Sequence, residues 1–259
     1  MAAGVARKVY DNVNKHFPLF FQLVGNMTIL FYPTLKCNLG CLYCFLRGSP
    51  SLPCGEKIDW DRVSATLNYI RDALNAKGST IVLHGGEPTT LDINLLERVI
   101  RFIRSHGFKV SLQSNIYNIT ESHIELFKKY GVSVGASIDG FPDINVLRGF
   151  FDEKGRELKR ESEKYRRKVM DNLEMLVSSG VCNGVISLLH RGNVGSGKRL
   201  ERFKAFIKWL VEIGVTSIRL NPMFATTGAA EKYELSNAEL ARVLVELYDF
   251  TRVFGVHCS

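Results

Sequence analysis

Short β-forming runs alternate with longer helical patterns along this whole 259-residue chain. Each run is dense in Val, Ile, Leu or Phe, as expected of strands that a parallel sheet buries on both faces. Such alternation is typical of repeated βα units. Six units fit an α/β fold of the open, partial TIM-barrel type. The predicted strands are Met27–Pro33, Ser79–Leu83, Phe108–Ser114, Val132–Ile138, Val181–Leu189 and Ser217–Asn221.

Residues that start and stop helices fall between these runs. Asp59 can cap a helix that runs to about Ala76, and Thr120 can cap one that runs to Tyr130. Ser236 and Glu239 form a capping-box pattern ahead of the last helix. Glycines precede five of the strands, where left-handed helix caps are expected: Gly78, Gly107, Gly131, Gly180 and Gly214.

The composition is that of an ordinary globular protein, with 46% hydrophobic and 23% charged residues. No apolar run approaches the ~18 residues that span a bilayer, so we expect a cytoplasmic protein without a membrane anchor. The net charge of +8 is modest for the length. A solvated helix face explains the basic run 154–168 at least as well as nucleic-acid binding, and we do not expect a nucleic-acid partner.

Three of the six cysteines, Cys37, Cys41 and Cys44, lie within one short segment. Thiolates suit iron–sulfur clusters, and a [4Fe–4S] cluster normally takes four cysteines. Three cysteines therefore predict a cluster with one iron open to a substrate or cofactor. The alternatives are structural zinc or plain unpaired thiols. Structural zinc usually needs four ligands in two pairs, and the chain has neither a second Cys-x-x-Cys nor a suitably spaced His pair.

Polar and glycine-rich segments follow the predicted strands, at the ends where parallel βα folds bind ligands. His84-Gly85-Gly86-Glu87-Pro88 follows the second strand, and Gln113-Ser114-Asn115 closes the third. The paired glycines let the backbone come close to a ligand. Ser137-Ile138-Asp139-Gly140 ends the fourth strand, and Arg148 follows it with a guanidinium suited to a carboxylate.

The cysteine segment resembles the signature Cys-x-x-x-Cys-x-aromatic-Cys of the radical S-adenosylmethionine (SAM) enzymes, with Tyr43 in the aromatic place. Gly-Gly-Glu-Pro is similar to the element that binds the SAM amino group in that family. In this chain His84 precedes that element, and the form His-Gly-Gly-Glu-Pro looks most like that of the peptide- and protein-modifying members. The interval from Ser137 to Arg148 is similar to that of the sulfatase-maturating enzymes and related peptide-modifying members. The resemblance extends from Cys37 to about Asn221 and implies a (β/α)6 core.

This resemblance also implies site roles. Cys37, Cys41 and Cys44 would bind the cluster. Gly85, Gly86 and Glu87 would bind the methionine part of SAM, and Ser137 with Arg148 its carboxylate and ribose. The string Gln113-Ser114-Asn115-Ile116 stands where relatives carry Gln-Thr-Asn-Gly, and the missing glycine is expected to alter that turn. The further cofactor-binding residues would be Tyr43, Phe45, Gln113, Asn115 and Leu189. His190, beside Leu189, is more often structural, and Asp139 is either a turn former or a pocket residue.

The function implied is reductive cleavage of SAM at the cluster, which yields a 5′-deoxyadenosyl radical that abstracts hydrogen from a peptide or protein substrate. An electron donor of the flavodoxin or ferredoxin type would be the second partner. Two alternatives stay open at this point. The substrate could be a small cofactor precursor or RNA, or the chain could be a non-catalytic iron–sulfur module. Gly-Gly-Glu-Pro argues against the module, because an electron carrier needs no amino-acid site.

The predicted division of the chain has three parts. Residues 1–24 would be an N-terminal helical extension and residues 25–235 the radical SAM core. Residues 236–259 would be a C-terminal helix, which the resemblance identifies as a candidate start of a truncated SPASM or twitch region. That region carries auxiliary clusters in relatives, and Cys258 would be its first ligand if the chain is truncated there. Cys54 and Cys182 are too scattered to form such a site by spacing alone.

Overall fold

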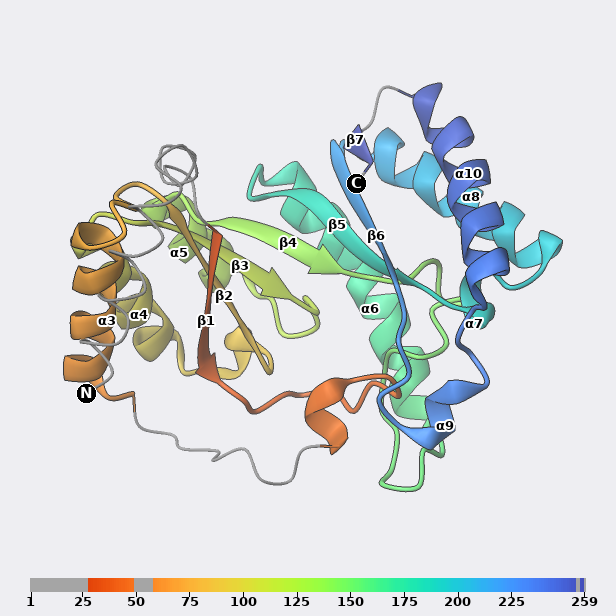
Figure 1. Ribbon diagram of the computed structural model, residues 1–259, viewed down its shortest axis with the longest axis horizontal. Coiled ribbons are helices and arrows are strands. Elements are labelled where there is room, and N and C mark those ends of the chain that lie inside the picture. The colour runs from red at the N-terminus through yellow and green to blue at the C-terminus, as the bar shows by residue number, and fades with distance from the viewer. Residues whose placement is uncertain (1–27, 49–57, 255–256, 259) are drawn as a thin grey trace, which may run out of the picture.

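The computed structural model describes residues 28–48, 58–254 and 257–258. It contains one parallel sheet whose strand order follows the chain order, with helices packed against it (Figure 1). The predicted extension 1–24 and Cys54 lie outside the described residues. The strands are β1 Thr28–Thr34, β2 Thr80–Gly85, β3 Lys109–Ser114, β4 Ser133–Ser137, β5 Cys182–Leu189, β6 Ser217–Pro222 and β7 His257–Cys258.

The predicted α/β partial barrel is confirmed, and strands β1 to β6 match the predicted runs to within two residues at each end. Strand β7 was not predicted. It pairs with β6 through only two residues, Ser217 with His257 and Ile218 with Cys258, and a segment that short carries no periodic signal.

Longer helices connect the strands. They are α3 Trp60–Asp72, α4 Ile93–Ser105, α5 Glu121–Tyr130, α6 Lys159–Ser178, α8 Gly197–Glu212 and α10 Asn237–Arg252. Four one-turn helices lie in the loops, namely η2 Phe45–Gly48, η3 Pro88–Thr90, α7 Arg191–Val194 and α9 Gly228–Glu231. None of the helices in the described ranges is both long and apolar enough to cross a lipid bilayer.

The predicted caps are mostly confirmed. Asp59 accepts a hydrogen bond from the Arg62 amide at 3.0 Å, and Ser236 and Glu239 form the capping box of α10. The five predicted glycine caps all have positive φ, from 59° at Gly131 to 103° at Gly214. Two details differ. Helix α3 ends at Asp72, earlier than predicted, and the Thr120 hydroxyl contacts His123 Nδ1 at 2.8 Å instead of capping a backbone amide.

Side chains alternate between two environments along the central strands. In β2, Ile81 and Leu83 are buried against the helices, whereas Val82 and His84 on the opposite face are only half-buried. The same alternation continues in β3 and β4. The helix-covered face therefore carries the main hydrophobic core, and the other face is the inner, open side of the partial barrel.

Candidate functional site

The loop between β1 and η2 carries the three predicted cluster cysteines. Cys37 is exposed, Cys41 is buried and Cys44 is half-buried, and all three are free thiols. Burial raises the pKa of the Cys41 thiol to about 11, and the nearby Arg148 guanidinium opposes that rise. Phe45, the first residue of η2, is half exposed. No group of three His, Cys, Asp or Glu residues in the described ranges could hold a single metal ion.

Backbone contact between this loop and the Gly-Gly-Glu segment explains why Gly85 and Gly86 are both glycines. The Gly86 amide donates to the Thr34 carbonyl at 3.0 Å, and the Glu87 amide donates to the Lys36 carbonyl at 2.8 Å. A Cβ on Gly86 would lie 2.1 Å from the Lys36 carbonyl oxygen, and Gly85 has a φ of +111°. Only glycine fits at these positions, because the two chains touch backbone to backbone.

The Glu87 carboxylate joins the ends of β2 and β3. Its Oε1 accepts from the Thr89 amide, the Thr89 hydroxyl and the Ser114 hydroxyl at 2.8–3.1 Å, and its Oε2 accepts from the Asn115 amide at 2.7 Å. Burial raises the pKa of Glu87, and these hydrogen bonds oppose the rise. The residue is only 1% exposed, and these hydrogen bonds of its carboxylate hold the two loops together.

Asn115 extends this connection to the cysteines, because its side-chain amide donates to Asn38 Oδ1 at 2.7 Å. The following residue, Ile116, is fully buried with a φ of +53°. It stands where the resembled family has glycine, and its backbone has the left-handed conformation that glycine adopts most easily. This conformation is strained for a β-branched residue. Asn172 Nδ2 holds the Ile116 carbonyl at 2.7 Å.

Tyr43, Asp139 and Arg148 form a buried network behind the cysteines. The Tyr43 hydroxyl donates to Asp139 Oδ2 at 2.6 Å, and Arg148 Nε lies 3.0 Å from the same oxygen. The Leu188 amide donates to Asp139 Oδ1 at 2.9 Å. Arg148 also lies over the Tyr43 ring, 5.5 Å from its centroid. Asp139 is fully buried and connects the cysteine loop, Arg148 and strand β5.

Further contacts to the cysteine loop come from segments that sequence reasoning did not select. The amides of Gly40 and Leu42 each donate at 2.9 Å to carbonyls beside Arg148, those of Gly149 and Leu147. The hydroxyls of Thr226 and Thr227, after β6, donate to the carbonyls of Tyr43 and Leu42 at 2.9 and 3.0 Å. The loop is thus held by the segments that follow β2, β3, β4 and β6.

Ser137 and Gln113 lie together on the inner face of the sheet. Gln113 Nε2 donates to the Ser137 hydroxyl at 2.6 Å, and both side chains are half-buried. Leu189, predicted beside them, lies instead in the main core with no exposed surface. Its neighbour Leu188 packs near Cys41 and Tyr43. The structure therefore does not bring the Leu189 side chain to the site.

His190 has a structural position at the start of α7. Its Nδ1 accepts from the Gly192 amide at 3.0 Å, and its Nε2 is buried with no hydrogen-bond partner among the described residues. Burial lowers the pKa of His190 to about 4. Asp139 opposes this shift, whereas Arg148 and Arg199 add to it.

We expect His190 to make folding stability fall as the pH falls. The unfolded chain takes up the proton near pH 6.5 and the folded chain near 4, so the stabilisation is complete above pH 6.5 and is lost on acidification to about 4. The loss should reach about 3 kcal/mol. Urea unfolding from pH 7 to 4 checks this against His190→Gln, which should lack this component. Equal pH dependence in both proteins would contradict the assignment.

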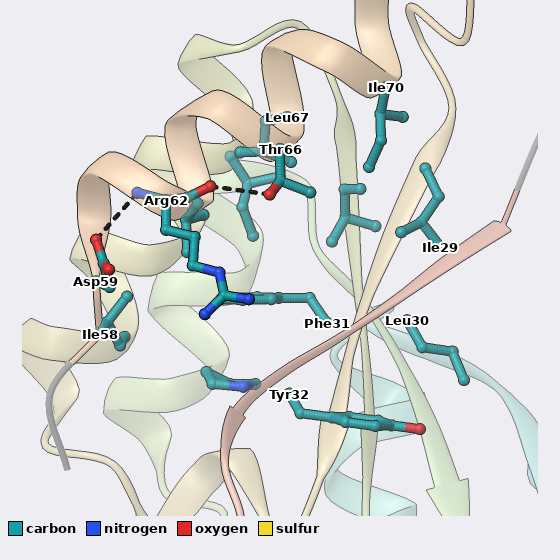
Figure 2. A pocket seen from close by; sticks show the side chains of 14 residues that line it. Ile29, Leu30, Phe31, Tyr32, Ile58, Asp59, Arg62, Thr66, Leu67 and Ile70 are labelled. Carbon is teal, nitrogen blue, oxygen red and sulfur yellow. Dashed lines mark hydrogen bonds between the residues drawn. The ribbon is translucent and has the colours of Figure 1, made fainter. Parts of the chain in front are cut away.

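A separate groove lies between β1 and α3, away from these residues (Figure 2). It has a volume of about 340 Å³ and is mainly apolar, with Ile29, Phe31 and Ile70 among its lining residues and Arg62 beside them. None of the predicted site residues lines it. The candidate site is therefore the loop cluster at the carboxyl ends of the strands.

Residues 31–210 match the Radical SAM superfamily. The cysteine-type anaerobic sulfatase-maturating enzyme of Clostridium novyi is 23% identical over 67% of this chain and 45% of its own length. The structure of anSMEcpe with bound AdoMet and Cp18Cys peptide aligns with a TM-score of 0.66 at 19% identity, covering 90% of this chain and 63% of that one. Streptococcus suis SuiB bound to precursor peptide SuiA aligns at 0.62 and 16% identity, over 96% and 52%. The chain spans about half the length of the curated relatives that it matches.

Proposed function

Since the chain belongs to the radical SAM superfamily of enzymes, we propose that it cleaves SAM reductively at a [4Fe–4S] cluster and takes hydrogen from a peptide or protein substrate. The observation that carries the proposal is the cysteine loop itself. Three free thiols lie on one loop, and the loops after four strands hold that loop in place.

The thiols of Cys37, Cys41 and Cys44 suit an iron–sulfur cluster by the chemistry of their sulfur donors. Three thiolates leave one iron for SAM. The Arg148 guanidinium close to Cys41 stabilises negative charge there, because it opposes the pKa rise that burial causes. Tyr43 is fixed by Asp139 and lies between two of the three thiols in sequence.

SAM would lie along the carboxyl ends of β2 to β4. In this proposal the backbone at Gly85 and Gly86 receives the amino group, and Ser137, Gln113 and Arg148 orient the carboxylate and ribose. Arg148 Nε forms an ion pair with Asp139 Oδ2 at 3.0 Å, and in this proposal the two Nη groups contact the ligand. Glu87 and Asn115 act indirectly here, since they fix the loops that present these groups.

The bound cofactors would supply the electron transfer and the carbon-centred radical, as is general for cofactor enzymes. The protein's own residues bind, orient and exclude water. Burial of Cys41, Tyr43, Asp139 and Arg148 keeps the rear of the site dry, whereas Cys37 faces the open side. In this proposal the substrate approaches from the Cys37 side of the loop.

Two observations support a peptide or protein as substrate. One solved structure of similar fold, that of anSMEcpe, has bound AdoMet and the Cp18Cys peptide, and another, that of SuiB, is bound to the precursor peptide SuiA. The inner face of the sheet here also has a cavity of about 450 Å³ that several strands line. An electron donor of the flavodoxin or ferredoxin type completes the proposal.

Formation of 5′-deoxyadenosine tests the proposal directly. Anaerobically reconstituted protein, reduced with dithionite and given SAM, should release 5′-deoxyadenosine and methionine in equal amounts, slowly, without any peptide. Chromatography with mass detection measures both products, and omission of dithionite should abolish them. A cluster-loaded, reduced preparation that forms no 5′-deoxyadenosine would contradict the proposed function.

A further inference from the structure

The inner cavity is lined by alternate residues of β1 to β6 and is mostly uncharged. His84, Gln113, Ser111 and Asn221 contribute polar groups, and Gly135 and Gly184 contribute only backbone. Burial lowers the pKa of His84, so its imidazole is neutral at pH 7. Arg219 is the one permanently charged side chain among the described residues that line this cavity, and no Asp or Glu lines it.

Two glycines leave room in the middle of the inner face. Gly135 of β4 and Gly184 of β5 are register partners, so the missing side chains lie next to each other. At Gly135 a Cβ would lie 2.4 Å from Gln113 Oε1, whereas at Gly184 it would meet nothing closer than 3.6 Å. The inner face of the sheet is therefore flat and open beside Gly184, and a bound peptide can approach the sheet closely there.

Arg219 lies on the same inner face of the sheet. Its neighbours in β6, Ile218 and Leu220, are buried in the core, so Arg219 lies on the opposite, cavity-lining face, where it is exposed. No carboxylate among the described residues pairs with it, whereas Arg166 pairs with Glu157 and Arg191 with Glu239. An arginine beside a cavity without acidic residues is a ready partner for a carboxylate ligand.

Sheet register relates Arg219 to the proposed SAM site. Ser137 pairs with Ile186, and Ile186 pairs with Arg219, so the three residues form one row across β4, β5 and β6. Neighbouring strands lie about 4.8 Å apart, which puts the Cα of Arg219 about 10 Å from that of Ser137. This separation equals about three residues of an extended peptide.

We propose that Arg219 anchors a carboxylate of the substrate in the inner cavity, with Asn221 beside it on the same face as a hydrogen-bond donor. The inference rests on the proposed function, because it assigns the substrate class of that same site. An Asp or Glu side chain or a free chain terminus would supply the carboxylate. Recognition of this kind favours substrates with an acidic group close to the residue that loses hydrogen.

Three matched hexapeptides test this assignment. One has a central Glu with both ends blocked, one has Gln with both ends blocked, and one has Gln with a free terminal carboxylate. Their dissociation constants are measured by calorimetry on the reconstituted, SAM-loaded protein. We expect at least one carboxylate peptide to bind about tenfold or more tightly than the blocked Gln peptide. The two carboxylate peptides distinguish a side-chain source from a chain terminus.

Arg219→Gln should abolish that preference and Arg219→Lys should keep part of it. Arg104→Gln, on the exposed surface of α4, is the matched control and should keep all of it. The inference is overturned if no peptide shows an acid preference, if none binds, or if Arg219→Gln keeps the preference. A tenfold loss of SAM affinity in Arg219→Gln with unchanged peptide preference would also overturn it.

The outcome is separable from that of the proposed function. Formation of 5′-deoxyadenosine by the unaltered chain without any peptide tests SAM cleavage alone. If the chain cleaves SAM yet shows no acid preference, only the Arg219 assignment fails.

Discussion

Replacement of Cys37, Cys41 or Cys44 by alanine, one at a time, is expected to abolish the complete iron–sulfur cluster. Three thiolates are the minimum set, and Cys182 outside this loop is buried on β5, where its thiol donates to the Gly184 carbonyl. Iron and sulfide counts after anaerobic reconstitution should fall from about four each per chain to near zero. The characteristic visible absorption should disappear with them.

Cys182→Ala is the matched control. It removes a buried thiol of similar size but should leave the iron and sulfide counts unchanged. Circular dichroism should show that all four variants are folded. A full cluster in all three loop variants would rule out the ligand assignment.

Glu87→Gln is expected to destabilise the fold and loosen the cysteine loop. The carboxylate accepts two backbone amides and two hydroxyls, and the amide nitrogen of glutamine cannot accept any of them. Hydroxyls can rotate away, but the amides of Thr89 and Asn115 cannot, so one buried donor loses its partner in either orientation. The expected cost is about 2–4 kcal/mol.

Glu125→Gln, on the exposed surface of α5, is the control and should change the unfolding free energy by less than about 0.5 kcal/mol. Chemical denaturation measures both variants. The cysteine loop gives a second readout, because Asn115 carries the contact from Glu87 to Asn38. Cys37 should react faster with a thiol reagent in Glu87→Gln than in the control. Equal stability in the two variants would show that the hydrogen bonds to the Glu87 carboxylate do not stabilise the fold.

Local patterns predicted the sheet well because its strands are short, apolar and separated by glycine caps. The end of α3 was less predictable, since the segment after Asp72 continues with residues that a helix tolerates. The chain instead turns at Asn75, which has a φ of +49°, before Gly78. Strand β7 depends entirely on its pairing with β6.

The sequence singles out candidate site residues but not the contacts between them. The hydrogen bond from Tyr43 to Asp139 joins segments about a hundred residues apart, and sequence spacing says nothing about such a pair. Thr226 and Thr227 carry no motif at all and bind through backbone carbonyls. Leu189 itself lies in the main core, and strand alternation brings its neighbour Leu188 toward Cys41 and Tyr43 instead.

Ile116 departs from the resembled pattern, which has glycine at this place. Its left-handed conformation would suit glycine, yet the side chain is fully buried in the core. Burial of an isoleucine contributes about 1.5–3 kcal/mol, which is comparable to the ~1–3 kcal/mol that the strained conformation costs. Hydrophobic packing thus offsets the strain of this left-handed conformation.

The most direct measurement of the central claim is the electron paramagnetic resonance spectrum of the reduced, reconstituted protein with and without SAM. A cluster held by only three thiolates has an iron that SAM can bind, so SAM should shift the spectrum of a protein that contains about four iron and four sulfide per chain. The shift should be absent with buffer alone. It should also be absent with methylthioadenosine, which lacks the α-amino and carboxylate groups of the methionine part of SAM. A complete, reducible cluster whose spectrum SAM leaves unchanged would contradict the account.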